Sequence, residues 1–239
     1  MHRSCYLLAS LMAAVLAVPS AAQEAGNAFY LTPADVDLVH VLAPPPAVDS
    51  PAGKADLQTV LAAVQSRTDA EITHAQADDE RNVFRFADVM GPNFRTENLP
   101  LATQLFRHVY QNGNAVTVAA KSYFQRQRPF VVDRDIKIIV VQAPDFSYPS
   151  NHSTFAYEAG ILLAAMVPEK AAAIFERAAD FAHSRVIAGV HFPTDIEAGR
   201  ISGSVIDNVL LHNAHFLADF EGAKSEVRAA LGLNADRGH

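Results

Sequence analysis

Cysteine is almost absent from this chain of 239 residues, since only Cys5 occurs and it lies near the amino terminus. A single thiol cannot form a disulfide within the chain, and it cannot supply the paired C-x-x-C ligands of a structural zinc site. The H-E-x-x-H zinc motif, the Walker loop and the G-x-G-x-x-G fingerprint are also missing. The sequence therefore contains none of the usual evidence for a zinc site, a nucleotide-binding loop or a dinucleotide-binding domain.

Positive charge and long apolar runs are also scarce. Lysine and arginine total 19 against 26 acidic residues, and the formal net charge of −7 argues against a nucleic-acid partner. Beyond the amino-terminal region, the longest apolar candidate is residues 136–141, far below the roughly 20 residues that a spanning helix needs. The sequence predicts no membrane span in the mature chain, and any attraction for an anionic ligand has to be local.

The amino terminus has the parts of a secretory signal. Arg3 precedes an apolar run at residues 6–18, and the small residues 20–22 match a cleavage site before Gln23. Cys5 lies before the apolar run and not after it, which does not fit a lipoprotein signal. We therefore predict a cleaved signal peptide at residues 1–22, which places the mature protein in the periplasm or outside the cell.

The rest of the chain is predicted to be an extended arm followed by one helical domain. Residues 23–53 form the arm, because the stretch 42–51 is too rich in proline for a helix. Residues 54–239 form the domain, with helices at 54–77, 85–90, 99–126, 151–167, 168–188, 195–211 and 215–231 and strand evidence limited to 137–141. Gly199 and Gly203 are expected to allow close helix packing. The predicted fold class is all-α, a compact helical bundle with its functional residues at helix ends.

Three short segments contain most of the residues that could bind a small anion. In the first, Lys121 and Arg128 are seven positions apart, which would bring both cations to nearly the same face of one helix. Pro129 disfavours helical geometry at the residue before it, so the helix is expected to end at Arg128. The guanidinium would then lie at the mouth of a site, where it can grip a phosphate-like anion with two hydrogen bonds.

The second segment, residues 149–152, precedes a run with helical apolar spacing. Ser150 is the expected N-cap of that helix. A helix amino terminus offers unpaired N–H groups and the positive end of the helix dipole, which together favour an anion. His152, in the first turn, would stand beside it.

The third segment, residues 184–195, joins two predicted helices. Arg185 continues an apolar stripe, so its guanidinium needs an anionic partner once it is buried. Gly189 is expected to end one helix and Thr194 to cap the next, which leaves His191 in a short bend with Asp195 within a turn of it. A carboxylate there can accept from one imidazole nitrogen and leave the other free to act.

Together, Lys121-x6-Arg128-Pro129, residues 149–152 and Arg185-x5-His191-x3-Asp195 resemble the three-part signature of the type 2 phosphatidic acid phosphatase superfamily, which also includes vanadium haloperoxidases. Within it, the chain is similar to bacterial class A non-specific acid phosphatases over nearly all of its mature length. Three ordered motifs are far more specific than one. The resemblance implies the helical bundle of that superfamily. It also implies a secreted acid phosphatase that hydrolyses small phosphomonoesters through a phosphohistidine, with no metal or other cofactor.

The resemblance also implies a role for each matching residue. His191 would be the nucleophile, Asp195 would orient its imidazole, and His152 would protonate the leaving alcohol. The phosphate oxygens would be held by Lys121, Arg128, Ser150, Asn151 and Arg185. Side-chain cations can supply the positioning and charge stabilisation that phosphoryl transfer needs. We expect an acidic optimum and inhibition by vanadate, which imitates the transferring group.

Asn151 departs from the family pattern, which has glycine at this position. Asparagine tolerates a left-handed backbone better than most residues, so we expect activity to persist. Two alternatives stay open: a periplasmic phosphate-binding homologue with weak or no turnover, and a vanadate-dependent haloperoxidase. A zinc site built from His183, His212 and His215 with His152 or His191 is also conceivable.

Taken singly, each site residue also has a structural interpretation, such as surface pairing or helix capping. The balance between hydrolysis and phosphotransfer to alcohols is left open by the sequence. Helices rich in alanine are compatible with a homo-oligomer and equally with an ordinary helical core.

Overall fold

The computed structural model describes residues 30–141 and 144–233. The predicted signal peptide and residues 23–29 of the predicted arm lie outside the described residues. Within the described ranges every regular element is a helix, which confirms the all-α prediction, and none of these helices is both long and apolar enough to cross a membrane. The elements are α1 (Leu38–Val41), α2 (Pro51–Ser66), α3 (Asp69–Ala77), η2 (Val83–Phe86), α4 (Ala87–Met90), η3 (Thr96–Asn98), α5 (Pro100–Phe124), α6 (Pro129–Val132), α7 (Asn151–Met166), η4 (Pro168–Lys170), α8 (Ala171–Ile187), α9 (Pro193–Leu210) and α10 (Ala214–Ala230).

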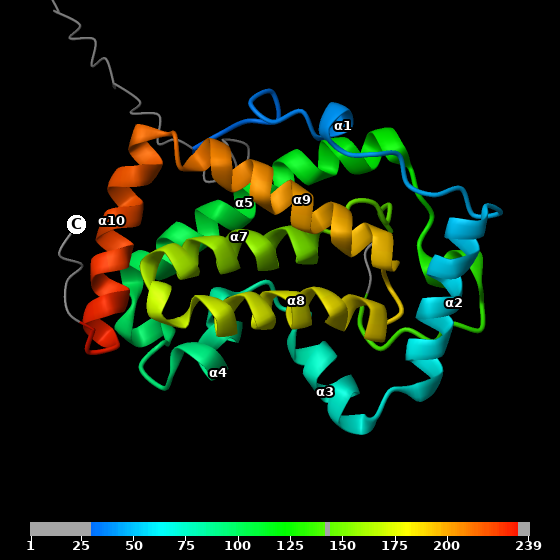
Figure 1. Cartoon of the computed structure of the whole chain (residues 1–239), viewed down its shortest axis with the longest axis horizontal. Coiled ribbons are helices and arrows are strands. Elements are labelled where there is room, and N and C mark those ends of the chain that lie inside the picture. Colours follow the sequence, from blue (N-terminus) through cyan, green and yellow to red (C-terminus); the bar gives the residue numbers. More distant parts are fainter. Residues whose placement is uncertain (1–29, 142–143, 234–239) are drawn as a thin grey trace, which may run out of the picture.

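Helix α7 is the centre of the bundle. It runs alongside α8 and α9, with which it shares extensive contacts (Figure 1). Its side chains are buried around most of the helix, including the apolar Phe155, Leu162 and Met166 and the acidic Glu158, as expected of a central helix. Helix α5 packs on α7 and on α10, which crosses one end of the bundle, while α2 lies at the other end against α8 and α9 (Figure 1).

Gly199 and Gly203 allow α9 to approach α7 closely, as their spacing predicts. A Cβ atom on Gly199 would lie 2.7 Å from the Ser150 carbonyl oxygen, and one on Gly203 would lie 2.7 Å from the Thr154 carbonyl oxygen. Neither position has room for a side chain, so glycine is required for this backbone approach. The contact holds the amino-terminal parts of α7 and α9 together, and both parts contain predicted site residues.

The helix predicted at 54–77 is two helices, α2 and α3. They are separated at Thr68, whose hydroxyl accepts from Glu71 N at 3.3 Å while the Glu71 carboxylate accepts from Thr68 N at 2.7 Å. This reciprocal capping box starts a new helix. The prediction of one continuous helix was wrong because apolar periodicity does not register a cap, although the Thr-x-x-Glu pattern is visible in the sequence.

The strand predicted at 137–141 is wrong, and the described residues contain no strand. An isolated strand has no neighbour for its backbone hydrogen bonds. Side chains from two helices bind the carbonyls instead: Arg67 Nη2 donates to Lys137 O at 2.7 Å, and Gln76 Nε2 donates to Ile139 O at 3.1 Å. The segment is therefore an extended connection anchored on α3 and on the α2–α3 junction.

Helix α5 ends at Phe124, earlier than the predicted end at Arg128. Gln125 adopts a left-handed conformation with φ 50° and ψ 32°, which turns the chain out of the helix. Arg128 then has an extended backbone and directly precedes α6. Helical spacing therefore does not bring Arg128 to Lys121, and the prediction of a shared helix face was wrong.

Helix α9 begins at Pro193, two residues before the predicted start. Phe192 N donates to Asp195 Oδ2 at 2.8 Å, so the carboxylate caps the helix from its third position. Proline at the first position has no N–H that needs a partner. Thr194, predicted to be the cap, instead accepts a hydrogen bond from Arg126 Nη1 at 2.6 Å through its hydroxyl, so that prediction was wrong.

Candidate active site

The predicted site residues all lie at the end of the bundle beside α2. The carboxyl ends of α5 and α8 and the amino ends of α6, α7 and α9 meet there (Figure 1). Two backbone hydrogen bonds tie the approaching segments together: Ser147 N donates to Arg126 O at 2.8 Å, and Ser150 N donates to Asp195 O at 3.0 Å. The structure thus gathers Lys121, Arg128, Ser150, Asn151, His152, Arg185, His191 and Asp195 in one region.

Arg128 directs its guanidinium at His191. Its Nη1 lies 3.1 Å from His191 Nε2 and donates to Val190 O at 2.8 Å. The side chain is 4% exposed, so the charge is almost fully removed from water. Its Nε and Nη2 donate to Asp145 and to the Phe146 carbonyl oxygen, so an anion bound at the imidazole would have to replace some of the present partners of this guanidinium.

Lys121 reaches the same place from α5. Its Nζ contacts the Phe146 carbonyl oxygen and lies 3.3 Å from Asp145 Oδ2. Burial, followed by the charge of Arg128, lowers the pKa of Lys121 to about 8, even though Asp145 acts in the opposite direction. The shared partner Asp145, and not a helix face, is what brings the two cations together.

His191 and Asp195 form a pair, as the sequence predicts. His191 Nδ1 lies 3.4 Å from Asp195 Oδ2, and the same oxygen accepts from Ser147 Oγ at 2.5 Å. Asp195 Oδ1 accepts from Arg126 Nη1 at 2.6 Å. With Arg128 donating toward Nε2, the neutral tautomer that fits carries its proton on Nδ1, toward the carboxylate.

Burial is the main reason that His191 is uncharged. It lowers the pKa of this histidine well below the usual value, and the charges of Arg128, Lys121 and Arg185 act in the same direction. A neutral imidazole keeps a lone pair on one ring nitrogen, which nucleophilic attack would require, and here that lone pair on Nε2 faces Arg128 Nη1. The surroundings of His191 therefore favour its neutral form.

Arg185 and His152 share the carboxylate and backbone of Asp79. Arg185 Nη2 lies 2.9 Å from Asp79 Oδ1, and His152 Nε2 lies 2.9 Å from Asp79 O. The Arg185 side chain is fully buried, and its guanidinium nitrogens make no hydrogen bond of good geometry. Asp79 is the anionic partner that the sequence requires for Arg185, but the contact is an ion pair at the edge of the guanidinium.

His152 is also held uncharged. Burial lowers its pKa well below the usual value, and the charges of Arg185 and Arg81 add to the effect. Burial likewise lowers the pKa of Arg185, to about 10. An anion bound among these groups would counter the repulsion between cations and raise the pKa of His152.

Ser150 and Asn151 begin α7 as predicted. The Ser150 hydroxyl accepts from Ser153 N at 3.3 Å, which is the expected N-cap interaction. Asn151 is a helical residue, and among the described residues other than glycine only Gln125 has a positive φ. Left-handed tolerance is therefore not what asparagine supplies here, and that part of the prediction was wrong. Its Nδ2 donates to Asn114 Oδ1 at 2.9 Å.

Sequence reasoning missed the partners that surround these residues. They are Arg126, Asp56, Ser147, Asp145 and Asp79, each within hydrogen-bond or ion-pair distance of a predicted site residue or of its partner. Arg126, Asp145 and Ser147 lie close to the motifs along the chain, so widening each motif by a few positions would have found them. Asp56 and Asp79 come from α2 and from the turn after α3, where no local pattern marks them.

One group of side chains in the described ranges has metal-ligand geometry. The ligand atoms of His74, Asp78 and Asp180 lie within 4.8 Å of one another. Asp78 already accepts from Arg177 Nη1 and Nη2 and from Arg85 Nε, so a cation would have to displace two arginines. We interpret this group as an ion-pair network. The zinc ligands considered above, His183, His212 and His215 with His152 or His191, form no such group in the described part of the chain.

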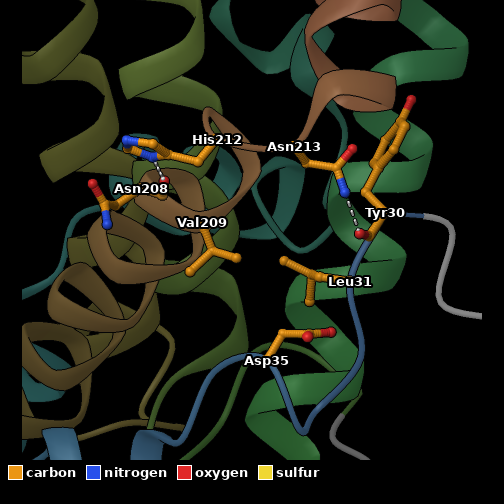
Figure 2. A pocket seen from close by; sticks show the side chains of 7 residues that line it. All are labelled: Tyr30, Leu31, Asp35, Asn208, Val209, His212 and Asn213. Carbon is orange, nitrogen blue, oxygen red and sulfur yellow. Dashed lines mark hydrogen bonds between the residues drawn. The ribbon is translucent and has the colours of Figure 1, made fainter.

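A cavity of about 450 Å³ lies between residues 30–35 and the turn after α9 (Figure 2). Asn213 Nδ2 donates to Tyr30 O at 2.8 Å, and His212 Nδ1 is 2.6 Å from Asn208 O. Among the described residues that line this cavity, none is one of the eight predicted site residues. Its polar groups anchor the segment near Tyr30 on the turn, so we interpret the cavity as a packing feature and not as the site.

The chain is similar in sequence to known proteins. Residues 108–218 match the model of the PAP2 superfamily. An acid phosphatase of Zymomonas mobilis is 30% identical over 198 residues, which cover 79% of this chain and 75% of that protein. A non-specific acid phosphatase of Salmonella typhi is 29% identical over 215 residues, which cover 85% of this chain and 84% of that protein.

A solved structure is similar as well. A bacterial vanadium-dependent iodoperoxidase superposes with a TM-score of 0.56 at 20% identity, covering 72% of this chain and 52% of that chain. At this identity the likeness shows the shared helical fold alone, and the match spans about half of the iodoperoxidase.

Proposed function

Because this chain belongs to the PAP2 superfamily and its acid phosphatase relatives match most of its length, we propose that it is a metal-independent acid phosphatase acting through His191. Its substrates are small phosphomonoesters. The observation that supports the mechanism most directly is the environment of His191, a buried neutral imidazole between Arg128 at Nε2 and Asp195 at Nδ1. Asp195 suits a nucleophile that becomes positively charged as it reacts, and Arg128 beside Nε2 is placed to meet the negative oxygens of the phosphate.

In the first step, the lone pair of His191 Nε2 forms a bond to phosphorus while the ester P–O bond breaks. The leaving oxygen takes a proton from His152, so an alcohol departs and a phosphohistidine remains. Lys121, Arg128 and Arg185 stabilise the charge on the three equatorial oxygens. Asp195 stabilises the imidazole as its positive charge develops.

His152 has to gain a proton before it can act as the acid. Its pKa is lowered in the ligand-free protein, so the proton arrives with the substrate: a phosphomonoester monoanion can pass its proton to His152 inside the site. This requirement favours acidic conditions, because the monoanion predominates below the second phosphate pKa of about 6. In the second step, His152 takes a proton from water, the oxygen attacks phosphorus, and the P–N bond to His191 breaks to release phosphate.

We also propose that the mature protein is periplasmic or secreted. The support is the amino-terminal pattern of Arg3, the apolar run 6–18 and the small residues 20–22. Amino-terminal sequencing of the exported protein tests this proposal, with Gln23 as the expected first residue. An amino terminus that retains residues 1–22 would contradict it.

The test of the mechanism is hydrolysis of p-nitrophenyl phosphate at mildly acidic pH with excess EDTA, using the mature protein and its His191→Ala variant. We expect turnover that survives EDTA and falls by more than about a thousandfold in the variant, because the nucleophile is lost. Orthovanadate should inhibit the intact protein strongly, because it imitates the transferring group.

The other outcomes separate the alternatives. Loss of turnover with EDTA, restored by zinc, would mean that the histidines serve a metal. Tight binding of orthophosphate without turnover would identify a phosphate-binding homologue. Trapping the phosphoenzyme by rapid acid-free quenching and mapping it to a residue other than His191 would retain the activity and overturn the proposed nucleophile.

A further inference from the structure

Asp145 places a carboxylate directly on the cations proposed to hold phosphate. Its Oδ1 accepts from Arg128 Nη2 at 2.6 Å, and its Oδ2 lies 3.3 Å from Lys121 Nζ. The same residue accepts from Arg128 Nε through its backbone oxygen at 3.1 Å. The two oxygens of the Asp145 carboxylate thus bridge the two cations, which are also the cations proposed to hold phosphate oxygens.

The exposure of the three side chains is unequal. Those of Lys121 and Arg128 are each 4% exposed, whereas that of Asp145 is 40% exposed. The cations are therefore held in place by packing, while the carboxylate lies at the mouth of the site beside solvent. Rotation of the Asp145 side chain toward water would release Nη2 of Arg128 and Nζ of Lys121 from the carboxylate, while both nitrogens keep their contact with the Phe146 carbonyl oxygen.

We propose that Asp145 is an internal counter-anion that competes with the phosphate group for Lys121 and Arg128, and so weakens the binding of both substrate and product. This inference rests on the proposed function and concerns the same site. In the ligand-free protein the carboxylate keeps the two cations together and neutralises part of their mutual repulsion. When a phosphate group binds, Asp145 gives up its contacts and remains close enough to repel a dianion.

The charges around Asp145 set the size of the effect. Lys121 on α5 and Arg128 before α6 face it directly, and the charge of Asp195 on α9 also acts on both of these cations. A dianionic phosphate meets repulsion from the Asp145 carboxylate in addition to the attraction of the cations, so affinity is lower than the cations alone would give. Weak binding of the product anion favours its release after each turnover.

Titration calorimetry with inorganic orthophosphate at neutral pH and fixed ionic strength tests the inference. We expect Asp145→Asn to bind orthophosphate about tenfold more tightly than the wild type, because one negative charge leaves the site while the side-chain shape stays. Asp145→Glu, which keeps the charge, should remain within about threefold of the wild type. Asp135→Asn removes an equal charge from an exposed position in the connection after α6, and should change the affinity by less than about twofold.

Kinetics add a readout that a structural role would not reproduce. For p-nitrophenyl phosphate, KM should fall in Asp145→Asn, and inhibition by orthophosphate should strengthen in parallel. Unchanged or weaker orthophosphate binding by Asp145→Asn, with the protein folded by circular dichroism, would overturn this inference and leave the proposed function standing. Failure of the wild type and of all three variants both to bind orthophosphate and to hydrolyse p-nitrophenyl phosphate would overturn both.

Discussion

Arg126 and Arg128 lie two positions apart in the sequence, and each is paired with aspartate at the same end of the bundle. Arg126 joins Asp56 at 2.8 Å and Asp195 at 2.6 Å, and all three side chains are at most 5% exposed. Arg128 joins Asp145 at 2.6 Å, with the carboxylate 40% exposed. The cations are equally buried, so the difference lies in the anions.

We infer that the two arginine–aspartate clusters have different roles because their carboxylates differ in exposure. Away from Arg126, the Asp56 and Asp195 carboxylates would remain buried without a counter-cation, so we interpret this cluster as permanent. It holds Asp195 beside His191. The Asp145 carboxylate can turn to water, so the Arg128 pair can exchange one anion for another. The N–O distances in the two kinds of ion pair are similar. We therefore infer that the exposure of the carboxylate decides whether the pair holds a residue in place or can give way to a bound anion.

The strongest test of the permanent cluster is Arg126→Met. The change leaves the Asp56 and Asp195 carboxylates buried without their cation, and we expect the free energy of unfolding to fall by about 3–5 kcal/mol. Urea titration followed by circular dichroism measures it. Arg200→Met, which removes an exposed cation paired with Glu197, is the matched control and should cost less than about 1 kcal/mol. An equal loss of unfolding free energy in Arg126→Met and Arg200→Met would show that the buried cluster stabilises the fold no more than a surface ion pair.

The catalytic contribution of the permanent cluster is tested by Asp195→Asn. We expect kcat to fall about a hundred- to a thousandfold with KM changed only a few fold, because the carboxylate stabilises charge that develops on His191 during the reaction. Steady-state kinetics in EDTA give both values. Asp56→Asn disturbs Arg126 equally but does not touch His191, so its kcat should fall much less. An equal fall in both variants would assign Asp195 a purely structural role.

The cluster of Lys121, Arg128 and Asp145, in which a bound anion can replace the carboxylate, should show its own pH dependence through Lys121. Its pKa of about 8 means that the ligand-free site loses this positive charge as the pH rises through that value. Loss of the substrate monoanion already weakens the reaction from about pH 6 upward, and loss of the Lys121 charge should make the rise in KM steeper above about pH 8. Lys121→Arg should move the rise to higher pH, because guanidinium stays charged. A KM that is flat to pH 10 in the wild type would contradict the proposed role of Lys121.

The smallest expected effect is that of Asp145→Asn on stability. The carboxylate is 40% exposed, so solvent screens its contacts, but its loss leaves Lys121 and Arg128 buried without this counter-charge. We expect the free energy of unfolding to fall by about 1–2 kcal/mol, less than for Arg126→Met. The same urea titration checks it alongside Arg126→Met. A loss comparable to that of Arg126→Met would show that Asp145 is a structural anion like Asp56.

Most of the helices could be predicted from apolar spacing. The residues that start α7 and α9 lie at or beside the first turns of those helices. Ser150 caps α7 from its own hydroxyl, and Pro193 with Asp195 organises α9 within one turn. These are local interactions, so the sequence contains them. The capping box at Thr68 was equally local and was overlooked.

The end of α5 could not be predicted in the same way. Gln125 is not glycine, and no residue near it in the sequence indicates a left-handed conformation at this position. The position of Arg128 depends on that turn, so the sequence predicted the right residue with the wrong geometry. Lys121 and Arg128 meet through Asp145 and not through helical periodicity.

The sequence by itself determined the helical class, the order of the three motifs and the pairing of His191 with Asp195, because each of these depends on residues within a turn or two of one another. Only the tertiary structure decided which anion meets each cation and how deeply each is buried. Arg126 pairs with Asp56 of α2, and Arg185 pairs with Asp79 of the turn after α3. No local sequence pattern links positions so far apart in the chain. The reason is that ion-pair partners and desolvation are set by how helix ends pack in space, whereas caps and periodicity are set along the chain.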